Sequence, residues 1–132
     1  MYLLDTNACI RLLNGSSPRL VERLQATPRS QVRLSSIVKA ELLFGARRSS
    51  RLADNLRLLK DFFSTLPSLP FDDRCAEEYG LLRAELDRAG TPIGPNDMLI
   101  AATARANSCT LVTHNAREFS RVSGLQYEDW EK

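Results

Sequence analysis

Three carboxylates lie next to or among apolar residues, at positions where packing alone would favour an uncharged side chain. Asp5 follows a short apolar run, where a strand is expected to end and a helix to begin. Glu41 falls within the apolar arc of a helix, between Ile37 and Phe44, and Asp97 opens the most apolar helix of the chain. A buried carboxylate is unfavourable unless a cation or strong hydrogen-bond donors compensate its charge. We therefore expect these three side chains to meet a cation.

Three acids from distant parts of the chain would repel each other if folding brought them together. Hard oxygen ligands without thiolate or imidazole partners favour Mg²⁺ or Mn²⁺ over zinc. Such an ion can activate a water for attack on a phosphodiester and neutralise the charge that develops on phosphorus. The predicted chemistry is metal-assisted phosphodiester hydrolysis.

Each acid also has a purely structural interpretation. Asp5 can serve as a helix cap, a role that Thr6 or Asn7 could share. Glu41 can form a salt bridge with Arg48, and an acid such as Asp97 in a first helical turn is stabilised by the helix dipole alone. The sequence leaves these alternatives open.

The elements that must position the acids alternate between strand and helix. Apolar periodicity and turn residues predict strands or extended pieces at 2–4, 32–34, 69–71, 110–113 and 125–127. Helices are expected to stop at Asn14-Gly15, to span 18–26, 37–48, 51–65 and 96–106, to run from Asp72-Asp73 to Gly90, and to make a short turn through Phe119. This alternation predicts an α/β fold, with a parallel sheet covered by helices on both faces. Ligands of such sheets bind at the carboxyl ends of the strands, where Asp5 is expected.

Length and composition limit the remaining possibilities. At 132 residues and 43% hydrophobic content the chain is expected to form one domain. No apolar run is long enough for a membrane span, and the first residues lack a signal-peptide pattern, so we expect no membrane association and a cytoplasmic location. The three cysteines are widely spaced, which favours buried free thiols over a disulfide framework or a zinc site.

Four segments in order resemble the successive motifs of PIN-domain ribonucleases, and more narrowly the VapC-type toxins of type II toxin–antitoxin modules. They are Leu3-Leu4-Asp5-Thr6-Asn7, Glu41-Leu42-Leu43-Phe44-Gly45-Ala46, Gly94-Pro95-Asn96-Asp97-Met98-Leu99-Ile100-Ala101-Ala102 and Leu111-Val112-Thr113-His114-Asn115. The resemblance covers essentially the whole chain. It implies a single PIN domain over 1–132, with a three-layer αβα fold around a parallel sheet of about five strands.

The resemblance also implies an activity and its residues. The expected activity is that of an endoribonuclease dependent on Mg²⁺, for which Mn²⁺ can substitute, with Asp5, Glu41 and Asp97 holding the metal directly or through water. Thr6 and Asn96 match polar positions that line the same pocket. Asn115 stands where the family often has a fourth catalytic acid, and whether Glu118 replaces that acid is open. His114 is not expected to act as a base, because the family position is not generally histidine.

Substrate and partners follow from the same resemblance. The expected substrate is a structured RNA, with tRNA favoured and the initiator tRNA a specific case. A homodimer, a higher toxin–antitoxin assembly, and DNA contact only through a VapB-type antitoxin are implied. The antitoxin tail is expected to cross the acidic pocket and place an Arg among the carboxylates. The expected antitoxin contact is the exposed side of a stripe formed by Leu52, Leu56, Leu59 and Phe63, although core packing is the commoner fate of such a stripe. RNA phosphates are expected to contact some of Arg11, Arg47, Arg48 and Arg51.

Three other functions fit parts of the sequence. A signalling receiver domain needs a lysine after a late strand, and Lys39, Lys60 and Lys132 do not follow predicted strands. A D-x-D phosphatase is disfavoured because Asn7 takes the second position. An inactive RNA-binding or antitoxin-sequestering scaffold remains the alternative, because Asn115 can indicate lost activity.

Overall fold

Five short parallel strands form the centre of the structure, a computed structural model that describes residues 1–132. The strands are β1 (Tyr2–Leu4), β2 (Val32–Ser35), β3 (Ser68–Leu69), β4 (Thr110–Val112) and β5 (Tyr127–Glu128). Their order is β3-β2-β1-β4-β5, and β1 pairs in register with both neighbours, Tyr2 lying opposite Val32 and Thr110. Together with the helices on its faces, this sheet confirms the predicted parallel αβα fold.

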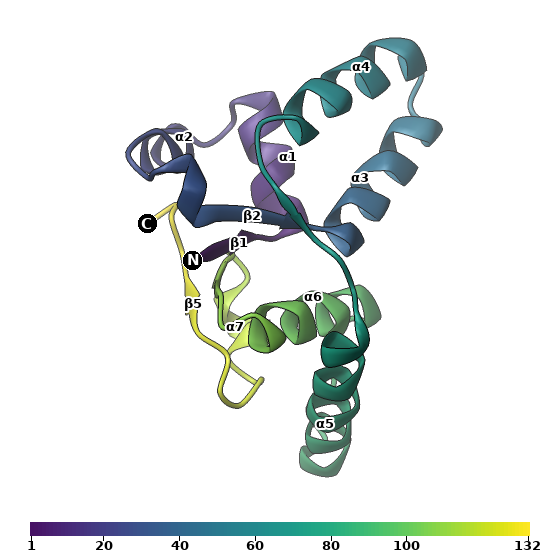
Figure 1. Ribbon diagram of the computed structural model, residues 1–132, viewed down its shortest axis with the longest axis vertical. Helices are drawn as coiled ribbons and strands as arrows, with labels where there is room; N and C mark the ends of the chain where they lie inside the picture. The colour runs from purple at the N-terminus through teal and green to yellow at the C-terminus, as the bar shows by residue number, and fades with distance from the viewer.

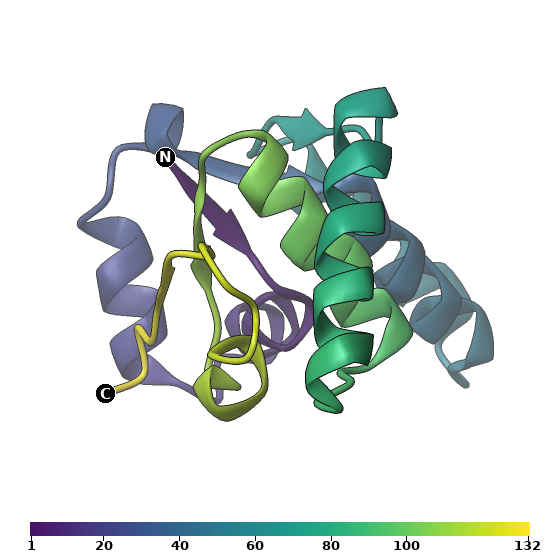
Figure 2. The same cartoon turned by 90° about the horizontal axis from the view of Figure 1, so that it is seen from below.

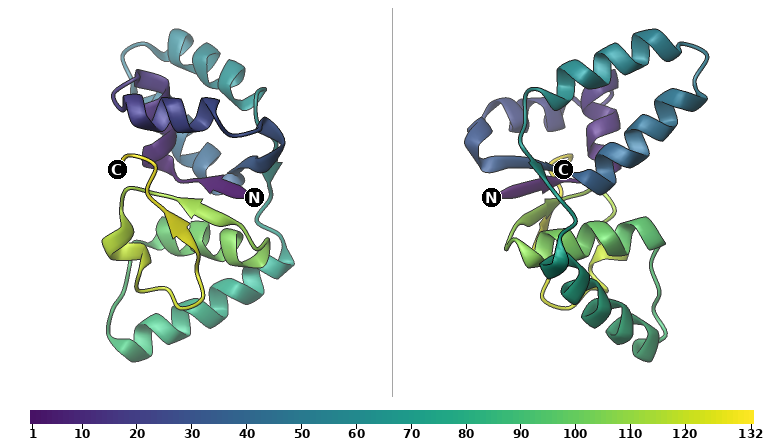
Figure 3. Two further views of the ribbon diagram at one scale, coloured as in Figure 1. Left: turned by 90° about the vertical axis from the view of Figure 1, so that its left-hand side faces the viewer. Right: turned by 45° about the vertical axis from the view of Figure 1, so that its right-hand side comes forward.

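Helices cover both faces of the sheet. They are α1 (Thr6–Asn14), α2 (Pro18–Gln25), α3 (Ser36–Arg48), α4 (Leu52–Phe63), α5 (Asp73–Ala89), α6 (Pro95–Ala106) and the short α7 (Ala116–Phe119), with a 3₁₀ turn at Arg29–Gln31. Helices α1, α2 and α4 lie on one side of the sheet and α5 and α6 on the other (Figures 1 and 3). Helix α5 packs along the outer side of α6 (Figure 2). The sheet is thus the middle of three layers.

Residues with local cap chemistry set the helix ends. The side chains of Asp5, Ser35 and Asp72 each accept a hydrogen bond from a backbone N–H in the first turn of the helix that follows. Gly15 ends α1 in the left-handed conformation, at φ 69°, which glycine adopts without strain. These short-range signals explain why the predicted boundaries agree with the structure to within a few residues.

The hydrophobic core lies where the sheet meets the helices. It includes Leu3 and Leu4 of β1 and Leu111 of β4, all fully buried. Helix α6 is buried on most of its circumference, as its composition predicts. The three cysteines are buried free thiols, which confirms that prediction too. None of the helices combines the length and the apolarity that crossing a membrane would require.

One packing prediction is wrong. Phe44 was expected to face inward beside Glu41, but its side chain is 62% exposed, and the guanidinium of Arg48 lies over its ring. Helix α3 instead packs through Val38, Leu42 and Ala46, which are spaced four residues apart. Two apolar stripes run side by side on this helix, and hydrophobic periodicity alone does not distinguish the stripe that packs from the one that remains exposed.

Candidate active site

Asp5 lies at the carboxyl end of the central strand and is only 5% exposed. Its Oδ1 accepts a hydrogen bond from the backbone N–H of Ala8 at 2.8 Å, so it does cap α1. Burial raises the pKa of this carboxyl, while hydrogen bonds from Thr113 and Ala8 and the charge of Arg11 oppose the rise. The cap therefore fixes a buried carboxylate at the edge of the sheet where ligands of parallel sheets bind.

Glu41 projects from the second turn of α3 toward the start of α1. The hydroxyl of Thr6 donates a hydrogen bond to Glu41 Oε1 at 2.6 Å. No ion pair forms between Glu41 and Arg48, so that structural alternative is wrong. The hydrogen bond orients one carboxylate oxygen and leaves Glu41 without a cationic partner.

Asp97 sits in the first turn of α6 with its side chain half-buried. Burial raises the pKa of this carboxyl to about 6, and the negative charges of Glu118, Glu41 and Asp5 contribute to the rise. The charges of Asp5 and Glu41 both act on Asp97, so the three acids that the sequence selects lie in one electrostatic neighbourhood.

Glu118 adds a fourth acid to the group. Its Oε1 accepts a hydrogen bond from the backbone N–H of Gly94 at 3.0 Å, and its Oε2 accepts one from the side-chain amide of Asn115. The charge of Glu118, and a hydrogen bond that protonated Asp97 donates to it, are among the causes of the raised pKa of Asp97. Asn115 thus holds an acid beside the site through its side-chain amide.

Sequence reasoning missed two residues that shape this group, Gly94 and Thr113. A Cβ atom at Gly94 would lie 3.3 Å from Asp97 Oδ2, which is tighter than an ordinary contact, and the Gly94 N–H also holds Glu118. Thr113 Oγ1 accepts the N–H of Asn115 at 2.9 Å, and Thr113 hydrogen-bonds to Asp5. Both residues lie inside the segments that carry the family resemblance, Gly94 in the third and Thr113 in the fourth. This location is the only sequence signal that could have identified them as site residues.

The other predicted residues are placed less centrally. Asn96 is exposed and lines, with Glu41, a cavity of about 280 Å³ between α3 and α6. Arg11 lies near Asp5 but is paired with Glu131 at 3.2 Å. The remaining arginines that are predicted to bind RNA phosphates are exposed near the far end of α3, about two helical turns beyond Glu41: Arg47, Arg48 and Arg51.

The four acids share the chemistry of a ligand set for a divalent cation. No basic side chain forms an ion pair with Glu41, Asp97 or Glu118, so their mutual repulsion is uncompensated within the protein. Carboxylate oxygens alone are the donor set of hard ions that keep part of their water shell. An ion bound among these acids would lie at the edge of the sheet, where it could meet a phosphate.

Comparison with known proteins relates this geometry to a family. The PIN domain family model matches residues 2–125. The tRNA(fMet)-specific endonuclease VapC of Salmonella typhimurium is 40% identical over 129 residues, covering 98% of this chain and 97% of that protein. Ribonuclease VapC2 of Rickettsia felis is 39% identical over 133 residues, covering 100% and 99%. The crystal structure of DNA-bound VapBC from Salmonella typhimurium superposes with a TM-score of 0.93 at 40% identity, over 98% of this chain and 97% of that one.

Proposed function

The chain belongs to the PIN-domain family and within it to the VapC ribonucleases, and we propose that it is a Mg²⁺-dependent endoribonuclease toxin that cleaves tRNA. The observation that carries the proposal is the convergence of Asp5, Glu41 and Asp97, with Glu118 beside them, at the carboxyl ends of the central strands. A relative that is 40% identical carries the name tRNA(fMet)-specific endonuclease, which favours initiator tRNA as the substrate. Residues 1–132 act as a single PIN domain, and a tRNA substrate requires a cytoplasmic protein.

Asp5, Glu41 and Asp97 would hold the ion, directly or through water, and Mn²⁺ can substitute for Mg²⁺. When bound, the ion supplies Lewis-acid activation of water and compensation of the phosphate charge. Thr6 fixes one oxygen of Glu41, while Gly94 and Asn115 fix both oxygens of Glu118. These contacts orient the acids before substrate arrives, so that little reorganisation is needed during the reaction. In-line attack of water leaves a 5′-phosphate and a 3′-hydroxyl.

Arg11 is the arginine best placed to contact an RNA phosphate near the acids, since its charge acts on Asp5. Its present partner, Glu131, is largely buried, so phosphate binding would have to compete with this ion pair. Arg47, Arg48 and Arg51 would contact more distant phosphates of a large substrate such as tRNA. Such contacts weaken as salt concentration rises.

The test uses the purified chain, free of antitoxin, and total tRNA. We expect discrete fragments with 5′-phosphate ends in Mg²⁺ and none in EDTA, with the cut positions identified by end mapping. Cleavage that persists in EDTA, or fragments ending in a cyclic phosphate, would contradict the metal-dependent mechanism. If the folded protein cleaves neither tRNA nor ribosomal RNA, the inactive scaffold becomes the better interpretation.

The hydroxyl of Thr6 provides a graded test of the site. Replacement by valine keeps the side-chain shape but removes the donor to Glu41 Oε1, so we expect Thr6→Val to lower the rate of cleavage roughly tenfold, as loss of a residue that orients a metal ligand typically does. The rate is measured on end-labelled tRNA at saturating Mg²⁺. Thr6→Ser keeps the hydroxyl and should retain most of the activity. Equal loss in both variants would mean that the hydrogen bond is not what matters.

An apolar groove supports a VapB-type antitoxin as partner. A cavity of about 260 Å³ lies between α1, α3 and α4, lined mainly by apolar side chains, and it reaches Glu41 at one end. Ile10 and Leu58 line this cavity although 42% and 46% of their surfaces are exposed. A peptide bound there could place a basic side chain among the acids. A homodimer and a larger toxin–antitoxin assembly belong to the same proposal, with DNA contacted only through the antitoxin.

The groove makes a prediction that leaves the acids untouched. Leu58→Asp puts a charge in an apolar contact, and we expect it to weaken antitoxin binding by about tenfold to a hundredfold, the range for losing a well-buried leucine contact. Binding is measured by calorimetry with the cognate antitoxin. Ala53→Asp, on α4 but outside the groove, is the matched control. Similar losses in the two variants would argue against this groove, and tRNA cleavage by free Leu58→Asp should be unchanged.

A further inference from the structure

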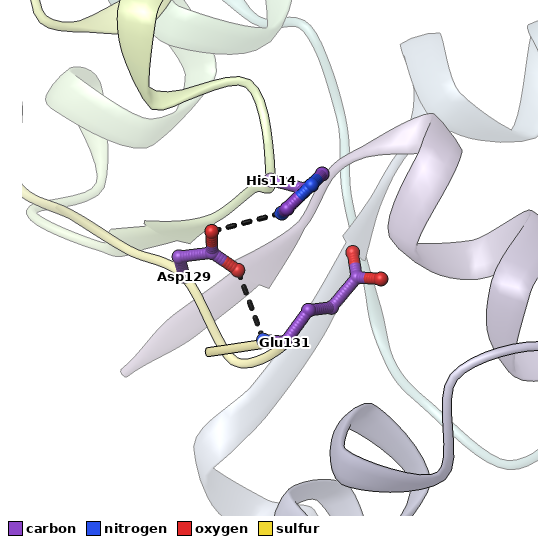
Figure 4. A group of neighbouring side chains, drawn as sticks. All are labelled: His114, Asp129 and Glu131. Carbon is purple, nitrogen blue, oxygen red and sulfur yellow. Dashed lines mark hydrogen bonds and ion pairs between the residues drawn. The ribbon is translucent and has the colours of Figure 1, made fainter.

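A second group of metal-ligating side chains lies at the end of β4 and β5. His114 follows β4, and Asp129 and Glu131 follow β5, the strand paired with β4 (Figure 4). His114 Nδ1 lies 2.9 Å from Asp129 Oδ2, and one ligand atom from each of the three residues lies within 4.8 Å of the other two. Two ligands of one tetrahedral zinc ion, each about 2.0–2.1 Å from it, lie about 3.3 Å apart, so this hydrogen-bonded pair would have to open by only a few tenths of an ångström.

The chain positions these donors before any ion is present. Trp130, between the two acids, is buried beside Tyr2 and anchors the C-terminal segment. Asp129 and Glu131 are therefore held inward, with side chains only 9% and 13% exposed, while His114 is 52% exposed and leaves a path from solvent. The backbone N–H of Glu131 donates to Asp129 Oδ1 at 2.9 Å, which leaves Oδ2 toward the imidazole. Little rearrangement separates this group from a ligand set.

The carboxylates around this group outnumber their cationic partners, which favours binding of another cation. Arg11 pairs with Glu131 at 3.2 Å, and the charges of both residues act on Asp5. The largely buried carboxylates of Asp5 and Glu131 thus share one guanidinium, and His114 is the only ion-pair partner of Asp129. Burying carboxylates in excess of their cationic partners is unfavourable, and a divalent ion would compensate the excess.

We propose that His114, Asp129 and Glu131 form a binding site for a divalent transition-metal ion of the zinc type, separate from the acidic site. The imidazole determines the class of ion, because nitrogen ligands favour zinc and its first-row neighbours over Mg²⁺. A set of carboxylates alone carries no such preference. Water would complete the shell. By joining residues that follow β4 and β5, the ion would tie the C-terminal segment to the sheet beside the acids.

Zinc binding is tested by titration calorimetry on protein without a histidine tag. The Asp97→Asn background removes a ligand from the acidic site and so weakens zinc binding there, and the buried thiols of Cys9, Cys75 and Cys109 do not compete. We expect one equivalent of Zn²⁺ to bind. Adding His114→Ala or Asp129→Asn should weaken that binding at least tenfold, and adding Glu77→Gln, an exposed acid on α5, should leave it unchanged.

The imidazole gives an independent readout, because His114 is the only histidine of the chain. One equivalent of Zn²⁺ should shift its ring proton signals in the NMR spectrum. Unmoved ring signals, or zinc binding that survives His114→Ala, would overturn the proposal. His114→Ala in the otherwise unchanged chain should still cleave tRNA in Mg²⁺, which separates failure of this site from failure of the ribonuclease. Because His114 is exposed, this variant should fold even if Asp129→Asn does not.

Discussion

We expect the Asp5→Asn variant to cleave tRNA at least about a hundredfold more slowly than the parent chain, because it removes a charged ligand from a site that acts through its metal ion. The substitution changes the volume of the side chain very little. Asparagine caps helices as well as aspartate does, so α1 should still begin at Thr6. The measurement is the initial rate of fragment formation in Mg²⁺, with circular dichroism to confirm the fold.

Asp72→Asn is the matched control for this prediction. Asp72 caps α5 as Asp5 caps α1, accepting the backbone N–H of Cys75 at 3.1 Å, but it lies away from the acids. The two variants therefore share the loss of a charged cap and differ in the loss of a metal ligand. A tenth or more of parental activity in Asp5→Asn, or equal losses in both variants, would show that Asp5 does not hold the catalytic ion.

The second large effect concerns stability without metal. Burial and the neighbouring acids raise the pKa of Asp97 from 3.8 to about 6. A group whose pKa is raised by folding stabilises the folded state below its unfolded pKa, and this contribution is lost as pH rises through the folded value. We therefore expect the melting temperature of the parent in EDTA to fall between about pH 4 and pH 7, and Asp97→Asn to reduce that fall. Asp5 contributes in the same direction, since its pKa is also raised.

At pH 7.5 in EDTA the Asp97→Asn variant should melt roughly 3 °C or more above the parent, about the shift that 1 kcal/mol gives in a domain of this size.

Added Mg²⁺ should stabilise the parent and have little effect on the variant, since ligands that bind the folded state raise its stability. Mg²⁺ should also bind the parent more weakly below about pH 6, because protons compete for Asp97. Scanning calorimetry measures all three effects, with the exposed Asp61→Asn as control. A destabilised Asp97→Asn would mean that the acids do not repel each other in the folded chain.

Local chemistry made much of this fold predictable from sequence. Asp5, Ser35 and Asp72 begin helices through hydrogen bonds that span three residues, and Gly15 and Gly90 end helices because of their backbone freedom. Signals of this range are visible in any short window of sequence. The predicted elements agree with the structure for this reason. That Asp5, Glu41 and Asp97 belong to one site was implied by the family resemblance rather than by any local signal.

Long-range packing was less predictable. The exposure of Phe44 depends on which stripe of α3 meets its neighbours, which is a property of the assembled layers. The position of Glu118 depends on a backbone N–H of Gly94 that lies 24 residues away in sequence. The ion pair between Arg11 and Glu131 joins residues 120 apart, and no local pattern announces it. Side chains that are placed by distant partners are those that sequence reasoning left open.

The order of strands has a consequence for the cell that synthesises this protein. β1, the central strand, is synthesised well before β4, one of its two neighbours in the sheet. Asp97 and Glu118 reach Asp5 and Glu41 only after that late segment has been translated. A nascent chain that has reached Glu41 but not Asp97 therefore carries two of the four acids of the site and cannot form the site. A polypeptide released early by a stalled ribosome would be harmless to the tRNA around it.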